Sequence, residues 1–125
     1  MYKVDIVNEG GFKFKANSKG YDLLISPKGD GISPPDVLLA SLGSCIGVYI
    51  RKYAEGAKID IPGFDISIEA EFSKERPVCF REINVSIILK NTDIDDRRKE
   101  ALIGFIKNCP VHNTLKADPV VNIKI

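Results

Sequence analysis

Apolar and polar residues alternate in six short stretches of this chain, and a two-residue period is the pattern of a β-strand with one buried face. The stretches lie at residues 2–8, 12–15, 21–25, 64–72, 82–90 and 119–125. Glycine-containing or polar turns separate the first three, which predicts an N-terminal β-meander. The turn at residues 74–77 separates the next two, so we expect them to pair as a hairpin. The last stretch predicts a C-terminal strand.

A long central helix is predicted from residue 33 onward. Ser33 suits the N-cap, Pro34 suits the first turn, and Asp36 stands three residues after the cap, as in a capping box. No charged residue occurs at positions 37–50. A helix that is apolar on every side must be covered on every side, so this helix is expected to be buried and to end near Gly56 as its C-cap. It is too short an apolar run for the roughly 20 residues that a bilayer requires.

A second helix is predicted to start at a further capping-box pattern, with Thr92 as the cap. Its apolar face comprises Ile94, Ala101, Leu102, Phe105 and Ile106. We expect the helix to end or kink at Cys109-Pro110, with a short extra turn at residues 111–115. The order of elements predicts an α+β fold with mostly antiparallel sheet, in a single domain over residues 1–125.

This amount of sheet cannot cover the uncharged helix on all of its sides. A second copy of the chain would supply the missing cover, so the pattern predicts a homodimer in which the two central helices pack together. We therefore expect dimerisation because the central helix needs to be buried on all sides, and light scattering tests this expectation.

Composition adds limits on partners and location. The 125 residues carry a formal net charge of +1, which gives no electrostatic reason to expect binding to nucleic acid or to a membrane surface. Three cysteines do not form a secreted disulfide framework, and the N-terminus lacks the apolar core of a signal peptide. We expect a cytoplasmic protein with reduced thiols.

Two cysteines are the first candidates for chemistry. Cys45 lies within the central helix among Gly43, Ser44 and Gly47, small residues that favour either close packing of another segment or room for a ligand. Cys109 lies where a helix ends, near backbone donors that favour a thiolate. Inert packing in the core is the alternative for each, because cysteine is among the most buried residue types. Cys79, on a strand edge, is interpreted as incidental.

The other candidate groups are less informative. His112 is the single histidine, and Cys109 with His112 supplies two ligands where zinc needs three or four, so no metal site is expected. His112 is most simply a surface or capping residue. The basic run at residues 97–99 is interpreted as the solvated face of the second helix, and no glycine-rich phosphate loop occurs.

Two motifs together resemble the OsmC/Ohr family, the osmotically inducible and organic hydroperoxide resistance proteins. They are SPPDVLLASLGSC, which ends at Cys45, and KNCPVHNTL, which contains Cys109. The intervening hairpin and second helix occur in the family's order, and the resemblance covers most of the chain. It implies an intertwined α+β homodimer with a long central helix from each subunit.

The resemblance also implies an activity. Members of this family reduce organic hydroperoxides with a cysteine pair, so Cys45 matches the attacking cysteine and Cys109 the resolving one. No bound cofactor is implied, and an external dithiol would reduce the resulting disulfide. Asp36, Arg51 and His112 are candidate neighbours of this site, and each is interpreted as more structural than catalytic.

The sequence departs from the family at the pair that activates the thiolate. Peroxidase members use an N-terminal arginine and a glutamate near the start of the central helix, whereas no arginine precedes Arg51 here and the glutamate position is Pro35, followed by Asp36. An N-terminal lysine, Arg51 or Arg81 are possible substitutes. The alternative function is a dimeric small-molecule-binding protein with little or no peroxidase turnover.

Overall fold

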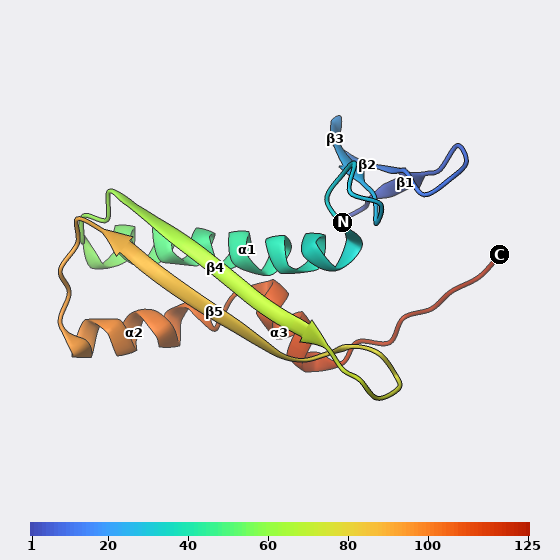
Figure 1. Cartoon of the computed structure of the whole chain (residues 1–125). Coiled ribbons are helices and arrows are strands. Elements are labelled where there is room, and N and C mark those ends of the chain that lie inside the picture. The colour runs from blue at the N-terminus through green and yellow to red at the C-terminus, as the bar shows by residue number, and fades with distance from the viewer. The chain divides into compact units, whose positions relative to one another are not determined.

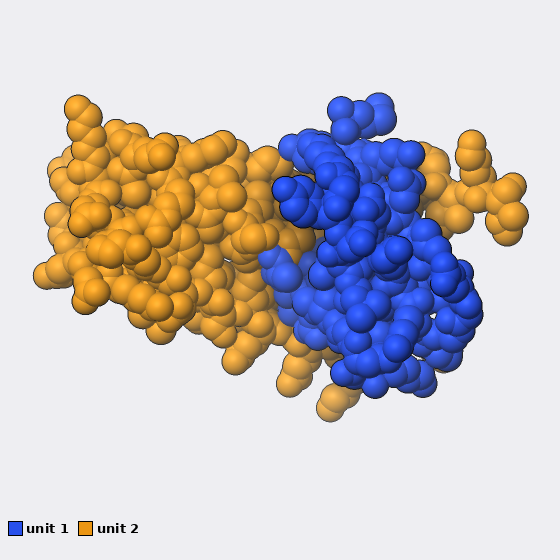
Figure 2. Space-filling model, turned by 90° about the horizontal axis from the view of Figure 1, so that it is seen from above, with its two compact units in different colours: residues 1–40 blue, residues 41–125 orange.

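The computed structural model describes all 125 residues and contains five strands and three helices. In chain order, the elements are β1 (Asp5–Val7), β2 (Phe14–Ser18), β3 (Tyr21–Ile25), α1 (Pro34–Ala57), β4 (Gly63–Phe72), β5 (Phe80–Lys90), α2 (Asp96–Ile106) and α3 (Pro110–Ala117) (Figure 1). The chain divides into two compact units, residues 1–40 and 41–125, which Figure 2 colours separately. Helices combined with two small antiparallel sheets confirm the predicted α+β class. The single domain over residues 1–125 stays a prediction.

The first unit contains the predicted β-meander, with strand order β1-β2-β3 and antiparallel pairing throughout. Its first turn is longer than the alternation indicated. The Asn8 side-chain amide donates to the Lys13 carbonyl at 2.8 Å, and Gly10 and Gly11 adopt φ values of 115° and 64°. This closed turn includes Phe12, so β2 begins only at Phe14.

Both ends of α1 follow from local chemistry. The Ser33 hydroxyl accepts from the Asp36 backbone N–H at 3.3 Å and donates to the Asp36 carboxylate at 2.7 Å, as the capping box predicts. The predicted C-cap at Gly56 is wrong. The helix continues to Ala57, and Lys58 adopts the left-handed conformation at φ 55° that terminates it. No helix of the structure has both the length and the apolarity to span a membrane.

The second unit has its core between one face of α1 and the elements that follow. The long antiparallel hairpin of β4 and β5 confirms the predicted pairing and lies over α1 and α2 (Figure 1). Residues spaced by four along α1 are buried against apolar groups from the later elements. The buried cluster comprises Leu42, Ile46, Ile50, Ala54, Ile61, Ile94, Leu102, Ile106 and Cys109.

The helical glycines of α1 allow β4 to approach closely. A Cβ atom at Gly43 would lie 2.8 Å from Cδ1 of Ile68, and one at Gly47 would lie 3.4 Å from the Phe64 ring. A contact of 2.8 Å is closer than van der Waals contact permits. The small residues near Cys45 therefore provide room for packing by the hairpin.

The start of α2 differs from the prediction. Asp95 is the N-cap, and its carboxylate accepts from the Arg98 backbone N–H at 2.8 Å. The Thr92 hydroxyl instead donates to the Lys90 carbonyl at 2.9 Å, in the turn that follows β5. Asp95 also has the right chemistry for a cap, and it alone is positioned directly before the first helical turn. Ala101, predicted on the buried face, is exposed.

The predicted C-terminal strand is not formed. Residues 119–125 belong to no sheet, and Val121 and Ile123 are 75% and 88% exposed. Alternation creates a strand only where a partner strand offers hydrogen bonds, and none pairs with this segment within the chain. On α1, Leu38 and Val48 are likewise 40% and 52% exposed, so the uncharged run is not covered on every side within the chain.

Candidate functional site

Cys45 and Cys109 come together, although they are far apart in sequence. Their side chains lie close enough for the Cys109 thiol to raise the pKa of Cys45, and both cysteines are free thiols. Cys45 is half-buried on α1, whereas Cys109 has 0% of its surface exposed. A molecule arriving from solvent can therefore reach Cys45 more readily than Cys109.

The N-terminal turn of α3 lies against both sulfur atoms. Cys109 is the N-cap of α3, and its Sγ accepts from the His112 backbone N–H at 3.5 Å. The Val111 backbone N–H lies close enough to Cys45 to lower the pKa of its thiol. Pro110 occupies the first helical position, where its missing N–H leaves no donor unpaired. Helix α3 runs for eight residues from Pro110, longer than the single turn that the sequence predicted.

Burial raises the pKa of the Cys45 thiol above its ordinary value, because desolvation disfavours the thiolate. The neighbouring Cys109 thiol and the negative charge that Cys109 can carry raise this pKa further. The Val111 N–H and the positive charge of Lys52 act in the opposite direction and lower it. The net effect is a raised pKa.

Lys52 was not among the predicted site residues. Its Nζ lies 4.8 Å from the centroid of the Tyr49 ring, and that ring lies 5.7 Å from the ring of Phe105 on α2. Positions 45, 49 and 52 share one face of a helix, and helical side chains lean toward the N-terminus, which directs a lysine at position 52 back toward Cys45. The spacing of seven residues between Cys45 and Lys52 is the sequence signal that could have indicated this neighbour.

The other predicted neighbours have structural roles. Asp36 caps α1. The Arg51 guanidinium donates to the carbonyls of Ile61 and Pro62 and stacks over Phe64 at 5.0 Å, so it fixes the connection between α1 and β4. Arg81 is exposed on β5, and residues 97–99 are exposed on α2 as expected.

His112 is not a simple surface residue. Its side chain is half-buried, and its Nδ1 atom is buried without a hydrogen-bond partner. Cys79 lies in the loop between β4 and β5, where its backbone N–H donates to the Ser73 hydroxyl at 3.2 Å. No group of three or more His, Cys, Asp or Glu side chains is arranged to hold a metal ion.

Comparison with protein families decides the assignment. The model of the family described as OsmC-like protein matches residues 27–124, which include both cysteines. The chain belongs to the OsmC-like family. No curated protein matches it.

Solved structures of proteins from other organisms show the same fold. The structure resembles a protein from Psychrobacter arcticus 273-4 with a TM-score of 0.82 and 24% identity, covering 91% of this chain and 88% of that one. An OsmC-like protein from Mycoplasma pneumoniae matches with a TM-score of 0.80 and 25% identity, over 93% and 87% of the two chains. The organic hydroperoxide resistance protein OsmC from Legionella pneumophila matches with a TM-score of 0.68 and 20% identity, over 93% and 90%.

Proposed function

We propose that this OsmC-like protein is a thiol-dependent peroxidase that reduces organic hydroperoxides, with Cys45 as the attacking cysteine and Cys109 as the resolving cysteine. The observation that carries the proposal is the direct contact between the two thiols, one accessible and one buried. The structural likeness to a hydroperoxide resistance protein adds support.

The proposed reaction has two steps within the protein. The Cys45 thiolate attacks an oxygen of the hydroperoxide, the O–O bond breaks, and the alcohol leaves with the proton that the thiol released. Cys45 is thereby oxidised to a sulfenic acid while the peroxide is reduced. The Cys109 thiolate then attacks the Cys45 sulfur, and the hydroxyl group leaves as water with the proton from Cys109.

The protein's own groups assist this sequence. The Val111 N–H and Lys52 stabilise negative charge on Cys45, in the role that the arginine–glutamate pair has in peroxidase members of the family. Cys109 is already in contact with Cys45, so the sulfenic acid is captured before a second peroxide can oxidise it further. An external dithiol then reduces the disulfide by exchange, and no bound cofactor takes part.

We further propose that the active form is a cytoplasmic homodimer. Exposed apolar side chains on α1 and in residues 119–125 support this assembly, because a second copy would cover them and provide a strand partner for the C-terminal segment. Light scattering of the full chain is expected to give twice the monomer mass. A chain that ends after Asp118 is expected to dimerise more weakly, and a monomer for the full chain would contradict the assembly.

The decisive experiment treats the reduced protein with one equivalent of cumene hydroperoxide. Intact and peptide mass spectrometry are expected to show a Cys45–Cys109 disulfide, whereas Cys79 remains free. Cys45→Ser is expected to abolish the linkage, and Cys79→Ser is the matched control that retains it. If both thiols stay reduced while the hydroperoxide remains reactive toward a standard thiol peroxidase, the proposal fails.

The raised pKa of Cys45 favours a second candidate, a small-molecule-binding protein with little turnover. A thiol whose pKa is raised is less often in the reactive thiolate form at neutral pH. The two candidates differ in catalytic cycling with dithiothreitol, since only a peroxidase consumes many equivalents of hydroperoxide per protein.

A further inference from the structure

The second unit contains a cavity of about 630 Å³ that is lined by β5, the connection after it, α2, Ile46 of α1 and His112 of α3. This volume is within the range of about 300–1,000 Å³ typical of small-molecule sites. Neither Cys45 nor Cys109 lines it. Its hydrophobic lining is entirely aliphatic, with no Phe, Tyr or Trp side chain. The cavity therefore suits a flexible aliphatic chain.

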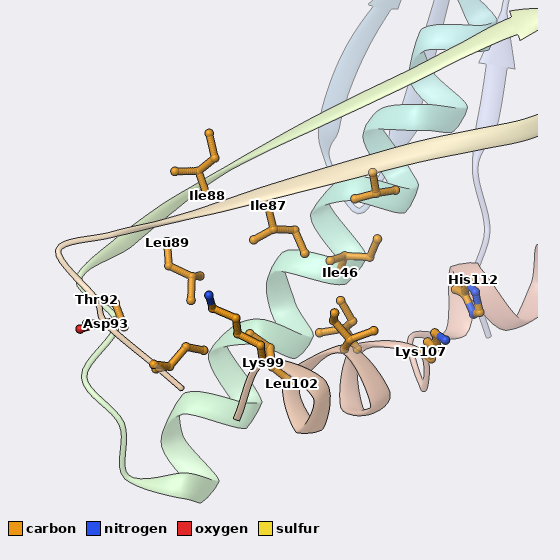
Figure 3. A pocket seen from close by; sticks show the side chains of 14 residues that line it. Ile46, Ile87, Ile88, Leu89, Thr92, Asp93, Lys99, Leu102, Lys107 and His112 are labelled. Carbon is orange, nitrogen blue, oxygen red and sulfur yellow. The ribbon is translucent and has the colours of Figure 1, made fainter. Parts of the chain in front are cut away.

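The two ends of the cavity differ in charge (Figure 3). His112 and Lys107 lie together at one end, and no acidic side chain lines that end. Asp93 lies at the opposite end with Thr92, and Lys99 lines the cavity between the two ends, beside Leu102. The aliphatic residues, such as Ile87 and Leu102, lie between the two ends.

The end formed by His112 and Lys107 lacks partners for its polar groups. The His112 Nδ1 atom is buried without a hydrogen bond, and burying a polar atom unpaired is costly. Lys107 is exposed and forms no ion pair, whereas Lys99 has a contact with Asp96 at 4.0 Å. With its proton on Nδ1, His112 donates a hydrogen bond, and Lys107 adds a positive charge.

From this arrangement we propose that the cavity binds an aliphatic carboxylate, with the carboxylate at His112 and Lys107 and the hydrocarbon chain along β5 and α2. A carboxylate oxygen accepts the hydrogen bond that Nδ1 lacks, and its charge complements that of Lys107. The proposal stands apart from the thiol chemistry, because it requires neither cysteine.

The single histidine provides the readout. We expect decanoate to shift the imidazole ¹⁵N resonances of His112 saturably in the full chain, at concentrations where it forms no micelles. Decanol and decylammonium have the same chain without the carboxylate, and both are expected to bind at least about tenfold more weakly. Equal shifts with all three probes would overturn the recognition of a carboxylate.

Variants separate the two parts of the proposed site. Lys107→Glu reverses the charge beside His112 and is expected to weaken decanoate binding about tenfold or more. Lys74→Glu makes the same change in the exposed turn between β4 and β5 and is expected to leave the affinity unchanged. Ile103→Asp places a charge at a cavity residue that is 50% exposed, so the chain is expected to fold while binding is lost.

Two further outcomes would count against the site. Absence of any decanoate-dependent shift in the reduced full-length protein would remove the proposal. A second copy of the chain is the other candidate occupant of the cavity, and light scattering during the titration tests it. If decanoate binds only as an oligomer dissociates, the second copy fills the cavity and the carboxylate proposal is wrong. The titration is repeated in Cys45→Ser, where an unchanged affinity is expected because the cavity does not include that residue.

Discussion

The thiols of Cys45 and Cys109 share the N-terminal turn of α3, which provides the Val111 N–H to Cys45 and the His112 N–H to Cys109. The turn thus offers each sulfur atom one backbone donor. Because the N-terminus of a helix carries a partial positive charge, it is a favourable place for sulfur atoms that become negative during a reaction. The proposed reaction therefore takes place where α1 meets the N-terminus of α3, in the C-terminal third of the chain.

The pH dependence of Cys45 reactivity is expected to show the influence of Cys109. Because the thiolate is the reactive form, a raised pKa shifts the alkylation profile to higher pH than that of an ordinary thiol. Cys109→Ala removes the neighbouring thiol that raises this pKa and is expected to move the profile toward lower pH, while burial keeps it above the ordinary position. The measurement is the rate of iodoacetamide labelling of Cys45 against pH, in a Cys79→Ser background. An identical profile in both proteins would contradict the coupling.

Replacement of Lys52 by glutamine is expected to shift the same profile to higher pH, because the positive charge lowers the pKa of Cys45. Lys52 is exposed, and an exposed charge interaction is worth about 1 kcal/mol or less, so labelling at neutral pH is expected to slow by a few-fold. Lys52→Arg retains the charge and the stacking on Tyr49, and Lys74→Gln is the control at a distant exposed lysine. Equal slowing by Lys52→Arg would show that the charge is not the cause.

The N-cap of α2 predicts that two nearby polar residues differ in their contribution to stability. Asp95→Ala is expected to lower the free energy of unfolding by about 1 kcal/mol, because the Arg98 N–H loses its partner. Thr92→Ala is expected to cost less than about 0.5 kcal/mol, because its hydroxyl donates in an exposed turn. Urea denaturation at one fixed protein concentration compares them. A larger loss of stability for Thr92→Ala than for Asp95→Ala would contradict this assignment and indicate that Thr92 is the N-cap, as the sequence predicted.

Substitution of two helical glycines by alanine compares the effect of open space with that of a close contact on stability. Gly104→Ala in α2 meets no atom within 4 Å and is expected to stabilise the protein by about 0.5–1 kcal/mol, through helix propensity alone. At Gly43, the new Cβ would lie 2.8 Å from Ile68, so the same substitution is expected to bring no gain or a loss. Thermal unfolding measures both, and stabilisation by Gly43→Ala would show that Ile68 moves aside without cost.

Several features of the fold were predictable because their causes are local. The Ser33 cap depends on Asp36 three residues later, and the hairpin of β4 and β5 depends on alternation on both sides of one turn. The predictions failed where a neighbouring residue had the same chemistry, as with Asp95 in place of Thr92, or where a strand needs a distant partner, as in residues 119–125. The cysteine pair was identified through the family motifs, and its contact then became visible in the structure.

By itself, the sequence determined the α+β class and the uncharged central helix that carries Cys45, since these follow from composition and spacing along short stretches, and its two cysteine motifs indicated the family through their resemblance. The tertiary structure decided what surrounds that cysteine: the α3 N-terminus and Cys109 beside it, with Lys52 lowering its pKa from the same helix. It also decided that His112 lines an aliphatic cavity. These relationships depend on how α1, α2 and α3 pack, and packing between distant segments is set by the whole core.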